Sequence, residues 1–367
     1  MEPDELAAWL RLVEAPGVGR EGARQLLAAF GSAPAVLAAG VAERRAVVGE
    51  RTAAALAGPA PEIEDLLVRT LEWLQAGAER RDIIVLGDSR YPRLLLESAD
   101  PPLLLYAEGH VDLLQADAVA VVGSRNPTPQ GLADARAFAA ALSRSGLTVV
   151  SGLALGIDGA AHDGALDGSG STVAVVGTGL DRVYPKSHLK LAHRIAAAGL
   201  IVSELPIGTP PLPPHFPSRN RIIAGLTRGT LVVEAALESG SLITARLAAE
   251  AGRDVFAIPG SIHSPLARGC HALIKQGAKL VDSAADVLDE LGVTSAPALP
   301  RAVATAAPPA KEDALLAALG FDPISIDSLV ERTGLSAGEL SVRLLDHELE
   351  GRVKRLPGQR FQRVAHG

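Results

Sequence analysis

Between residues 82 and 283 the sequence alternates short apolar runs, rich in valine and isoleucine, with longer windows rich in alanine. The runs are DIIVLG, AVAVVG, LTVVSG, TVAVVG, LIVSE, GTLVVEA, DVFAIPG and KLVDS. Nearly continuous apolar runs of this length are typical of strands buried on both faces of a parallel sheet. The alternation therefore predicts an α/β fold, with a doubly wound, extended Rossmann-like and mostly parallel sheet.

The region before the sheet has a helical pattern. Residues 1–60 place leucine and alanine at helical spacing around the turn PGVG at 16–19, which predicts a helix-hairpin-helix or SAM-like domain. The glycine amides of such a turn can contact a DNA backbone, although the region is as acidic as it is basic. DNA contact and a protein-binding or structural role therefore both stay open. The sheet domain is expected to span residues 61–292.

The region after the sheet predicts a linker and a third domain. Residues 293–310 are rich in alanine and proline and predict the linker. Residues 311–367 show three helical windows and two short strands around a Pro-Gly turn, the outline of a winged helix. The third helix, predicted at 336–352, carries more acidic than basic side chains and would repel the phosphates of a duplex. We expect this domain to contact proteins rather than to read duplex DNA.

Composition narrows the class of protein. Cys270 is the only cysteine, which excludes an internal disulfide and a zinc site of cysteine type. The first residues carry acids where a signal peptide carries bases, and no apolar run approaches the roughly 18 residues of a membrane span. We expect a cytoplasmic protein without a membrane segment. The net charge of −7 argues against a generic, charge-driven nucleic-acid binder, so phosphate recognition must be local.

The loops after the strands are the places to look for a site, because ligands of an open parallel sheet bind beyond the carboxyl ends of its strands. The loop GSRNPT at 123–128 lacks the G-x-G-x-x-G fingerprint of dinucleotide binding, and the chain has no P-loop. It also lacks the G-x-S-x-G elbow of hydrolases, and its histidines are too scattered for a metal site. We therefore predict neither a cofactor nor a metal.

Two pairs of titratable residues leave a catalytic alternative open. Asp158 and His162 are four residues apart and could form an acid/base pair, although capping and packing are the competing interpretation. Glu234 and Glu238 could act as general bases or could orient a loop. The alternative function is a nucleotide-hydrolysing Rossmann-like enzyme with Glu234 as its base.

The same loops suit the binding of phosphates without turnover. Helix N-termini after GSR, SGLALG and SGS would offer free N–H groups to an anion. Arg125, Lys186, Arg219 and Arg221 would add positive charge to this rim. Phe216 is expected to contact a base, with core packing as the alternative.

Several of these motifs, in order and spacing, resemble those of the bacterial DNA-processing protein A family, also called DprA or Smf. They are VVGSRNPTPQG, SGLALGIDGAAHDGAL, VAVVGTGLDRVYPKSH, HFPSRNRIIAGL, SGSLITA and GCHALIKQGA, within residues 80–285. The resemblance implies a non-catalytic homodimer that protects incoming single-stranded DNA (ssDNA) and loads the recombinase RecA onto it in natural transformation.

The predicted ssDNA-binding residues follow from the loops and the resemblance together. They are Gly123, Ser124, Arg125, Gly152, Ala154, Lys186, Phe216, Arg219, Asn220, Arg221, Gly240 and Ser241. No residue of a dimer or RecA interface can be assigned from the motifs.

Overall fold

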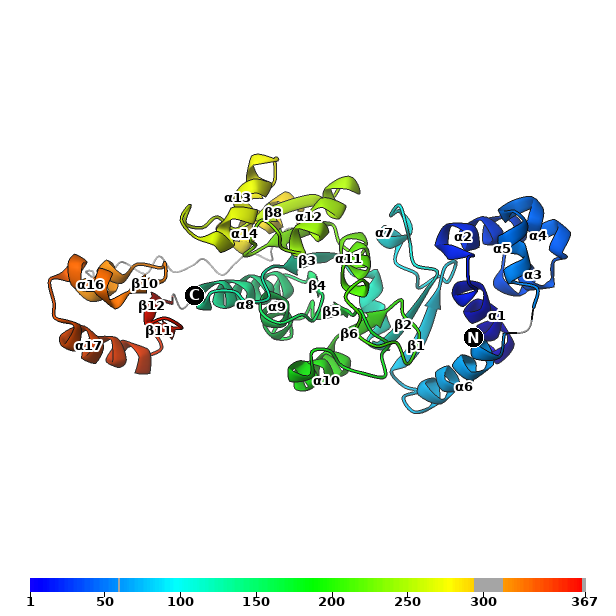
Figure 1. Ribbon diagram of the computed structural model, residues 1–367, viewed down its shortest axis with the longest axis horizontal. Coiled ribbons are helices and arrows are strands. Elements are labelled where there is room, and N and C mark those ends of the chain that lie inside the picture. The colour runs from blue at the N-terminus through cyan, green and yellow to red at the C-terminus, as the bar shows by residue number, and fades with distance from the viewer. Residues whose placement is uncertain (59, 294–312, 365–367) are drawn as a thin grey trace.

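The central element of the fold is a nine-stranded sheet with helices around it (Figure 1). The structure is a computed structural model, and it describes residues 1–58, 60–293 and 313–364. The strand order is β1-β2-β6-β5-β4-β3-β7-β8-β9. The strands are β1 (Arg81–Val85), β2 (Leu104–Gly109), β3 (Ala118–Val122), β4 (Thr148–Ser151), β5 (Thr172–Val175), β6 (Leu200–Ser203), β7 (Gly229–Val232), β8 (Asp254–Ala257) and β9 (Lys279–Leu280). Each predicted apolar run forms a strand, and the predicted α/β fold is confirmed.

One strand was missed by the sequence pattern. β2 pairs antiparallel with both β1 and β6, whereas every other pair in this sheet is parallel. Its apolar residues are two leucines, a tyrosine and an alanine, and none of them is β-branched. β2 makes the sheet mixed and joins the parallel part to the N-terminal region.

Helices cover both faces of the sheet because alternate residues of each strand point to opposite faces. On β3, Val119 and Val121 pack against one helical layer, and Ala120 and Val122 pack against the other. The first layer contains α8 (Pro129–Arg144), α9 (Ile157–Ala165) and α14 (Ala284–Glu290), and α10 (Leu189–Ala198) continues it. The second contains α7 (Arg93–Leu96), α11 (His215–Gly225), α12 (Ser241–Glu250) and α13 (Arg268–Lys275).

The N-terminal region is helical, as predicted, and contains α1 (Pro3–Glu14), α2 (Gly19–Phe30), α3 (Ala33–Ala38), α4 (Val41–Val48), α5 (Glu50–Ala55) and α6 (Pro61–Gln75). The turn between α1 and α2 needs its glycines, since Gly17 and Gly19 both have positive φ. These helices share one apolar core with the sheet, in which the rings of Trp73 and Tyr106 meet edge to face at 6.0 Å. The boundary at residue 60 stays a prediction.

The C-terminal residues form a winged helix with a core of its own, which confirms that part of the predicted fold. Its elements are α15 (Ala314–Leu319), β10 (Ile324–Ser325), α16 (Ile326–Thr333), α17 (Ala337–Leu349), β11 (Val353–Leu356) and β12 (Arg360–Arg363). The predicted linker at 293–310 lies, from residue 294 onward, outside the described residues.

Buried polar side chains hold the loop between β4 and α9. The Asp158 carboxylate accepts hydrogen bonds from the N–H groups of Gly152 (3.1 Å) and Ala154 (3.3 Å). Nε2 of His162 accepts the N–H of Leu153 at 3.2 Å, and its Nδ1 lies 2.7 Å from the Thr172 hydroxyl. Leu153 has a positive φ of 57°, a strained conformation that these contacts stabilise. The structure thus supports a positioning role for the pair rather than acid/base chemistry.

The environment of His162 keeps its ring neutral. Burial, helped by the nearby charges of His188 and Arg219, lowers the pKa of His162 to about 3. The other ring nitrogen must carry the proton, because Nε2 accepts the hydrogen bond from Leu153.

This neutral histidine makes stability depend on pH. Its folded pKa of about 3 lies below the unfolded value of about 6.5, so between these two pH values the proton binds mainly to the unfolded chain. Between pH 7 and pH 5 the wild type should lose about 2 kcal/mol more unfolding free energy than His162→Gln. Urea denaturation at both pH values measures this, with His193→Gln on the exposed face of α10 as control. Equal losses in wild type and His162→Gln would contradict the assignment.

Candidate nucleic-acid interface

A groove of about 650 Å³ lies beyond the carboxyl ends of the central strands. Its walls come from the loop after β3, the loop before α9, the segment that leads into α11, and the loop between β7 and α12. The predicted residues that line it are Gly123, Ser124, Arg125, Ala154, Phe216, Arg219, Asn220, Gly240 and Ser241. The tertiary structure therefore brings most of the predicted set together.

Arg125 and two aromatic rings form one side of the groove. The Arg125 guanidinium is exposed, and its Cζ lies 5.6 Å from the centroid of the Phe216 ring. The Tyr184 ring lies 5.5 Å from Phe216 at an angle of 41°. Tyr184 was not in the predicted set, although its place two residues before Lys186 in the YPK segment was a usable signal. The arrangement offers a cation for phosphate beside ring faces for bases.

Glu234, just after β7, holds the loop that carries Arg125. The Glu234 carboxylate accepts hydrogen bonds from the N–H (2.9 Å) and the hydroxyl (2.6 Å) of Thr128, and its carbonyl accepts the N–H of Ser124 (2.7 Å). Burial raises the pKa of Glu234, and the Thr128 contacts partly oppose this shift. A Cβ on Gly131 would lie 2.4 Å from the same carboxyl group, so a side chain at this position would displace the Glu234 carboxylate. Glu234 therefore orients the Arg125 loop.

Arg219 lines the groove, but its guanidinium is engaged by backbone carbonyls. Its side chain is buried, and Nη1 donates hydrogen bonds to the carbonyls of Gly152 (2.7 Å) and Val175. Burial lowers the pKa of Arg219 to about 10, although the Asp158 carboxylate opposes the shift. A Cβ on Gly152 would lie 2.5 Å from the guanidinium, so Gly152 is packed behind Arg219 rather than in the groove. Arg219 supports the groove floor and is already engaged by the strand ends.

Arg221 and Lys186 do not line the groove. Arg221 is two residues from Arg219 on α11, which places it on the other side of the helix. There it forms ion pairs with Glu204 and Asp100, so the prediction that it belongs to the same pocket is corrected. Lys186 begins the short 3-10 helix η2 (Lys186–His188) and is exposed beyond Tyr184.

The N-terminus of α12 also lines the groove. The hydroxyls of Ser239 and Ser241 are 2.7 Å apart, and the Asn220 side-chain amide donates to the carbonyl of Gly240 at 3.3 Å. A Cβ on Gly240 would meet no atom within 4 Å, so the backbone is open to close approach here. A helix N-terminus with hydroxyl groups suits an anion.

Within the described parts of the chain, no group of three or more His, Cys, Asp or Glu side chains is placed to hold a metal ion. The helices of those same parts include none that is long and apolar enough to cross a membrane.

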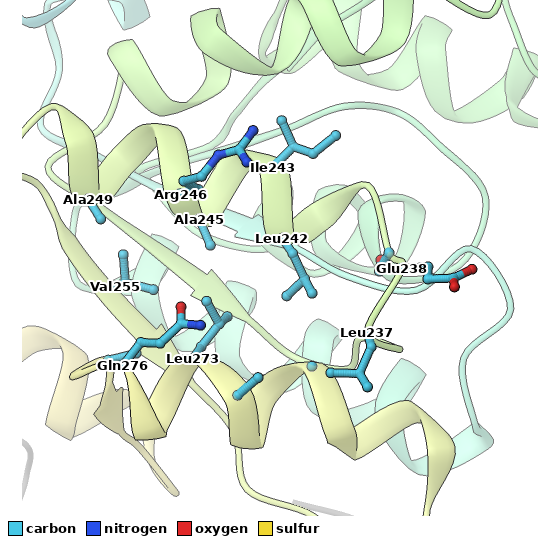
Figure 2. A pocket seen from close by; sticks show the side chains of 14 residues that line it. Leu237, Glu238, Leu242, Ile243, Ala245, Arg246, Ala249, Val255, Leu273 and Gln276 are labelled. Carbon is cyan, nitrogen blue, oxygen red and sulfur yellow. The ribbon is translucent and has the colours of Figure 1, made fainter.

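A second groove, of about 480 Å³, lies between α12, β8 and α13 (Figure 2). Leu242 of α12 and Leu273 of α13 point into the space between the two helices, with Val255 of β8 beside them. The lining shares Glu238 and Ser239 with the first groove. Its apolar character suits contact with a protein rather than with a sugar-phosphate backbone.

Comparison with known sequences agrees with this geometry. Residues 82–292 match the family described as DNA recombination-mediator protein A, and residues 299–359 match the DprA winged helix domain. Protein Smf of Escherichia coli is 41% identical over 308 residues, which cover 81% of each chain. DNA processing protein DprA of Streptococcus pneumoniae is 53% identical over 203 residues, 55% of this chain and 72% of that protein.

Solved structures lead to the same family. The X-ray structure of DprA from Streptococcus pneumoniae matches with a TM-score of 0.66 at 40% identity and covers 79% of this chain and 98% of that one. DNA processing protein A of Helicobacter pylori, whose structure describes a single-stranded DNA binding mode, matches with a TM-score of 0.52 at 31% identity. The match covers 57% of this chain and 95% of that one. By its sequence, its fold and the order of its strand-end motifs, the chain belongs to the bacterial DNA-processing protein A (DprA/Smf) family.

Proposed function

We propose that the groove binds the backbone of single-stranded DNA and that nothing is cut there. The observation that carries this proposal is Arg125, an exposed guanidinium beside the Phe216 and Tyr184 rings, in a groove that the α12 N-terminus also lines. The cation and the helix terminus attract phosphates, and the ring faces accept bases of any sequence. The single-stranded DNA binding mode described for the Helicobacter pylori relative supports the same assignment.

The aromatic rings favour a single strand over a duplex. A base can stack on Phe216 or Tyr184 only when its face is free, and in a duplex both faces are covered by neighbouring bases. The polar contacts available in the groove are directed at a sugar-phosphate backbone, which carries no sequence information. Binding is therefore selective for strandedness and nearly independent of sequence.

Membership of the family supports a wider role, which we propose as well. The protein acts in the cytoplasm as a homodimer, protects incoming ssDNA, and loads RecA onto it during natural transformation. The apolar groove between α12 and α13 supplies a surface of the kind that protein contacts use.

A nucleotide-hydrolysing enzyme remains the alternative, with Glu234 as its base. Glu234 is a poor candidate because both of its carboxylate oxygens accept hydrogen bonds from Thr128. A general base must reach the proton that it removes, and this carboxylate is directed at its own loop.

The DNA-binding proposal predicts different effects for Arg125 and Phe216. Arg125→Ala should weaken binding of a labelled dT oligomer by about 1.5–3 kcal/mol, because a charge-assisted phosphate contact is lost. The slope of log K against log salt is negative, and its magnitude should decrease by about 0.7. Phe216→Ala should weaken binding by roughly 1–3 kcal/mol through lost stacking, with the slope unchanged. Fluorescence anisotropy at several salt concentrations measures both.

The matched control is Arg144→Ala, an exposed arginine at the far end of α8, which should bind as the wild type does. Equal affinity for a matched duplex, or no binding of either DNA, would refute the proposal. Release of base or phosphate that disappears in Glu234→Gln would favour the enzyme instead.

The winged helix has a surface suited to proteins rather than DNA. On α17 the side chains of Val342, Leu345 and Leu349 are 63%, 54% and 80% exposed and recur at helical spacing on one face. The acidic Asp346 and Glu348 stand exposed on the same helix. An apolar stripe bordered by acids attracts a basic protein surface and repels phosphates.

Deleting residues 311–367 should therefore change ssDNA affinity by less than about threefold, the range of a neutral surface change. The measurement is the same anisotropy titration. Lys354→Ala/Arg355→Ala in the full chain is the control, because it removes basic charge from the wing alone. A large loss in both variants would assign the wing to the DNA site.

The proposed homodimer and RecA loading have their own test. Light scattering should give twice the 37.8 kDa chain mass. The protein should also speed the formation of RecA filaments on ssDNA, and Arg125→Ala should lose this effect while it keeps the dimer mass. A monomer, or filament rates that are the same with and without the protein, would contradict this part of the proposal.

A further inference from the structure

Five charged side chains from distant parts of the sequence meet beside the groove. Arg20 and Arg24 come from α2, Asp100 from the connection between α7 and β2, Glu204 from the end of β6, and Arg221 from α11. We refer to them as the Asp100 cluster. It joins the helix after the N-terminal glycine turn to the helix that carries Phe216 and Asn220.

Asp100 is the centre of this cluster. Its Oδ1 lies 2.7 Å from Nη1 of Arg24, and its Oδ2 lies 2.7 Å from Nη2 of Arg20 and 3.1 Å from Nε of Arg221. Arg221 also donates from Nη2 to both carboxylate oxygens of Glu204. The Arg20 and Arg24 contacts hold down the pKa of Asp100 against the effect of burial.

The innermost pair is well shielded from water. The side chains of Arg221 and Glu204 are only 13% and 14% exposed. Removing one member of such a pair leaves a charge with reduced solvation and no partner, and the segment that carries it moves or loosens.

The Arg221–Glu204 pair closes one wall of the groove. Glu204 begins the segment 204–221 and Arg221 ends it. Between them lie wall residues of the groove, among them Pro211, Phe216 and Asn220. An ion pair across the base of this segment limits how far the wall can move from the Arg125 loop.

We propose that Asp100, Glu204 and Arg221 are positioning residues for the DNA groove, and that α2 strengthens ssDNA binding through them without touching DNA. The arginines after the glycine turn, which a DNA-binding hairpin would direct at phosphates, are here bound to Asp100. This inference rests on the proposed ssDNA binding and assigns the N-terminal helices a structural role in it.

The direction in which one substitution changes ssDNA affinity distinguishes positioning from direct electrostatics. Asp100→Asn removes a negative charge near a polyanion site, so electrostatics alone predicts equal or tighter ssDNA binding. Positioning predicts binding weaker by roughly fivefold or more. Arg221→Gln should weaken binding similarly and leave the salt slope unchanged. If Arg221 contacted a phosphate directly, the substitution would reduce the magnitude of this negative slope by about 0.7.

The matched control is Asp163→Asn. Asp163 also pairs with two arginines, Arg136 and Arg194, but these link α8, α9 and α10 and not the groove wall. It should bind dT oligomers as the wild type does. Asp100→Glu, which keeps the charge, should recover most of the affinity lost in Asp100→Asn.

The full-length variants are compared by anisotropy with a dT oligomer after thermal melts show that they fold. If Asp100→Asn does not fold, Arg20→Gln/Arg24→Gln tests the same link from the more exposed side and should also weaken binding. Wild-type affinity in the variant used overturns the inference. If the wild type itself fails to bind ssDNA, or Arg125→Ala binds equally well, the proposed function has failed and not this inference alone.

Discussion

The groove depends on one buried arginine that joins the ends of two parallel strands. Arg219 donates to the carbonyls of Gly152, next to β4, and Val175, the last residue of β5. The Asp158 carboxylate balances the charge and holds the N–H groups of the same loop. Within this network the Asp158 carboxylate and Nη1 of Arg219 have hydrogen-bond partners, whereas Nε of Arg219 is buried without one.

This network explains how an acidic protein can provide a site for a polyanion. Three arginines of the strand-end motifs have separate tasks. Arg219 supports the floor, Arg221 closes a wall, and Arg125 is exposed beside the aromatic rings. Only the last of these is free to meet a ligand, so the attraction is confined to the groove. The excess of acids in the chain disfavours non-specific attraction of a polyanion to the remaining surface.

α11 connects the two sides of this arrangement. One side of the helix places Phe216 and Asn220 in the groove, and the other places Arg221 among the acids that also bind α2. Arg221 is five residues from Phe216 and one from Asn220, so its side chain leaves the helix about 100–140° away from theirs. The N-terminal helices thus share an apolar core with the sheet and an ionic contact with the groove wall.

The sequence by itself determined the fold class, the winged helix, the turn between α1 and α2, and the loops that form the groove. It could do so because apolar period, glycine turns and strand-end position are local properties that a chain shows residue by residue. β2 escaped because its leucines carry no β-branched signal. Only the tertiary structure decided which of the basic residues faces solvent. Arg219 and Arg221 find their partners at Gly152, Val175, Asp100 and Glu204, all distant in the chain. A side chain's charge is set by its identity, but its availability depends on which acids and carbonyls the fold brings to it.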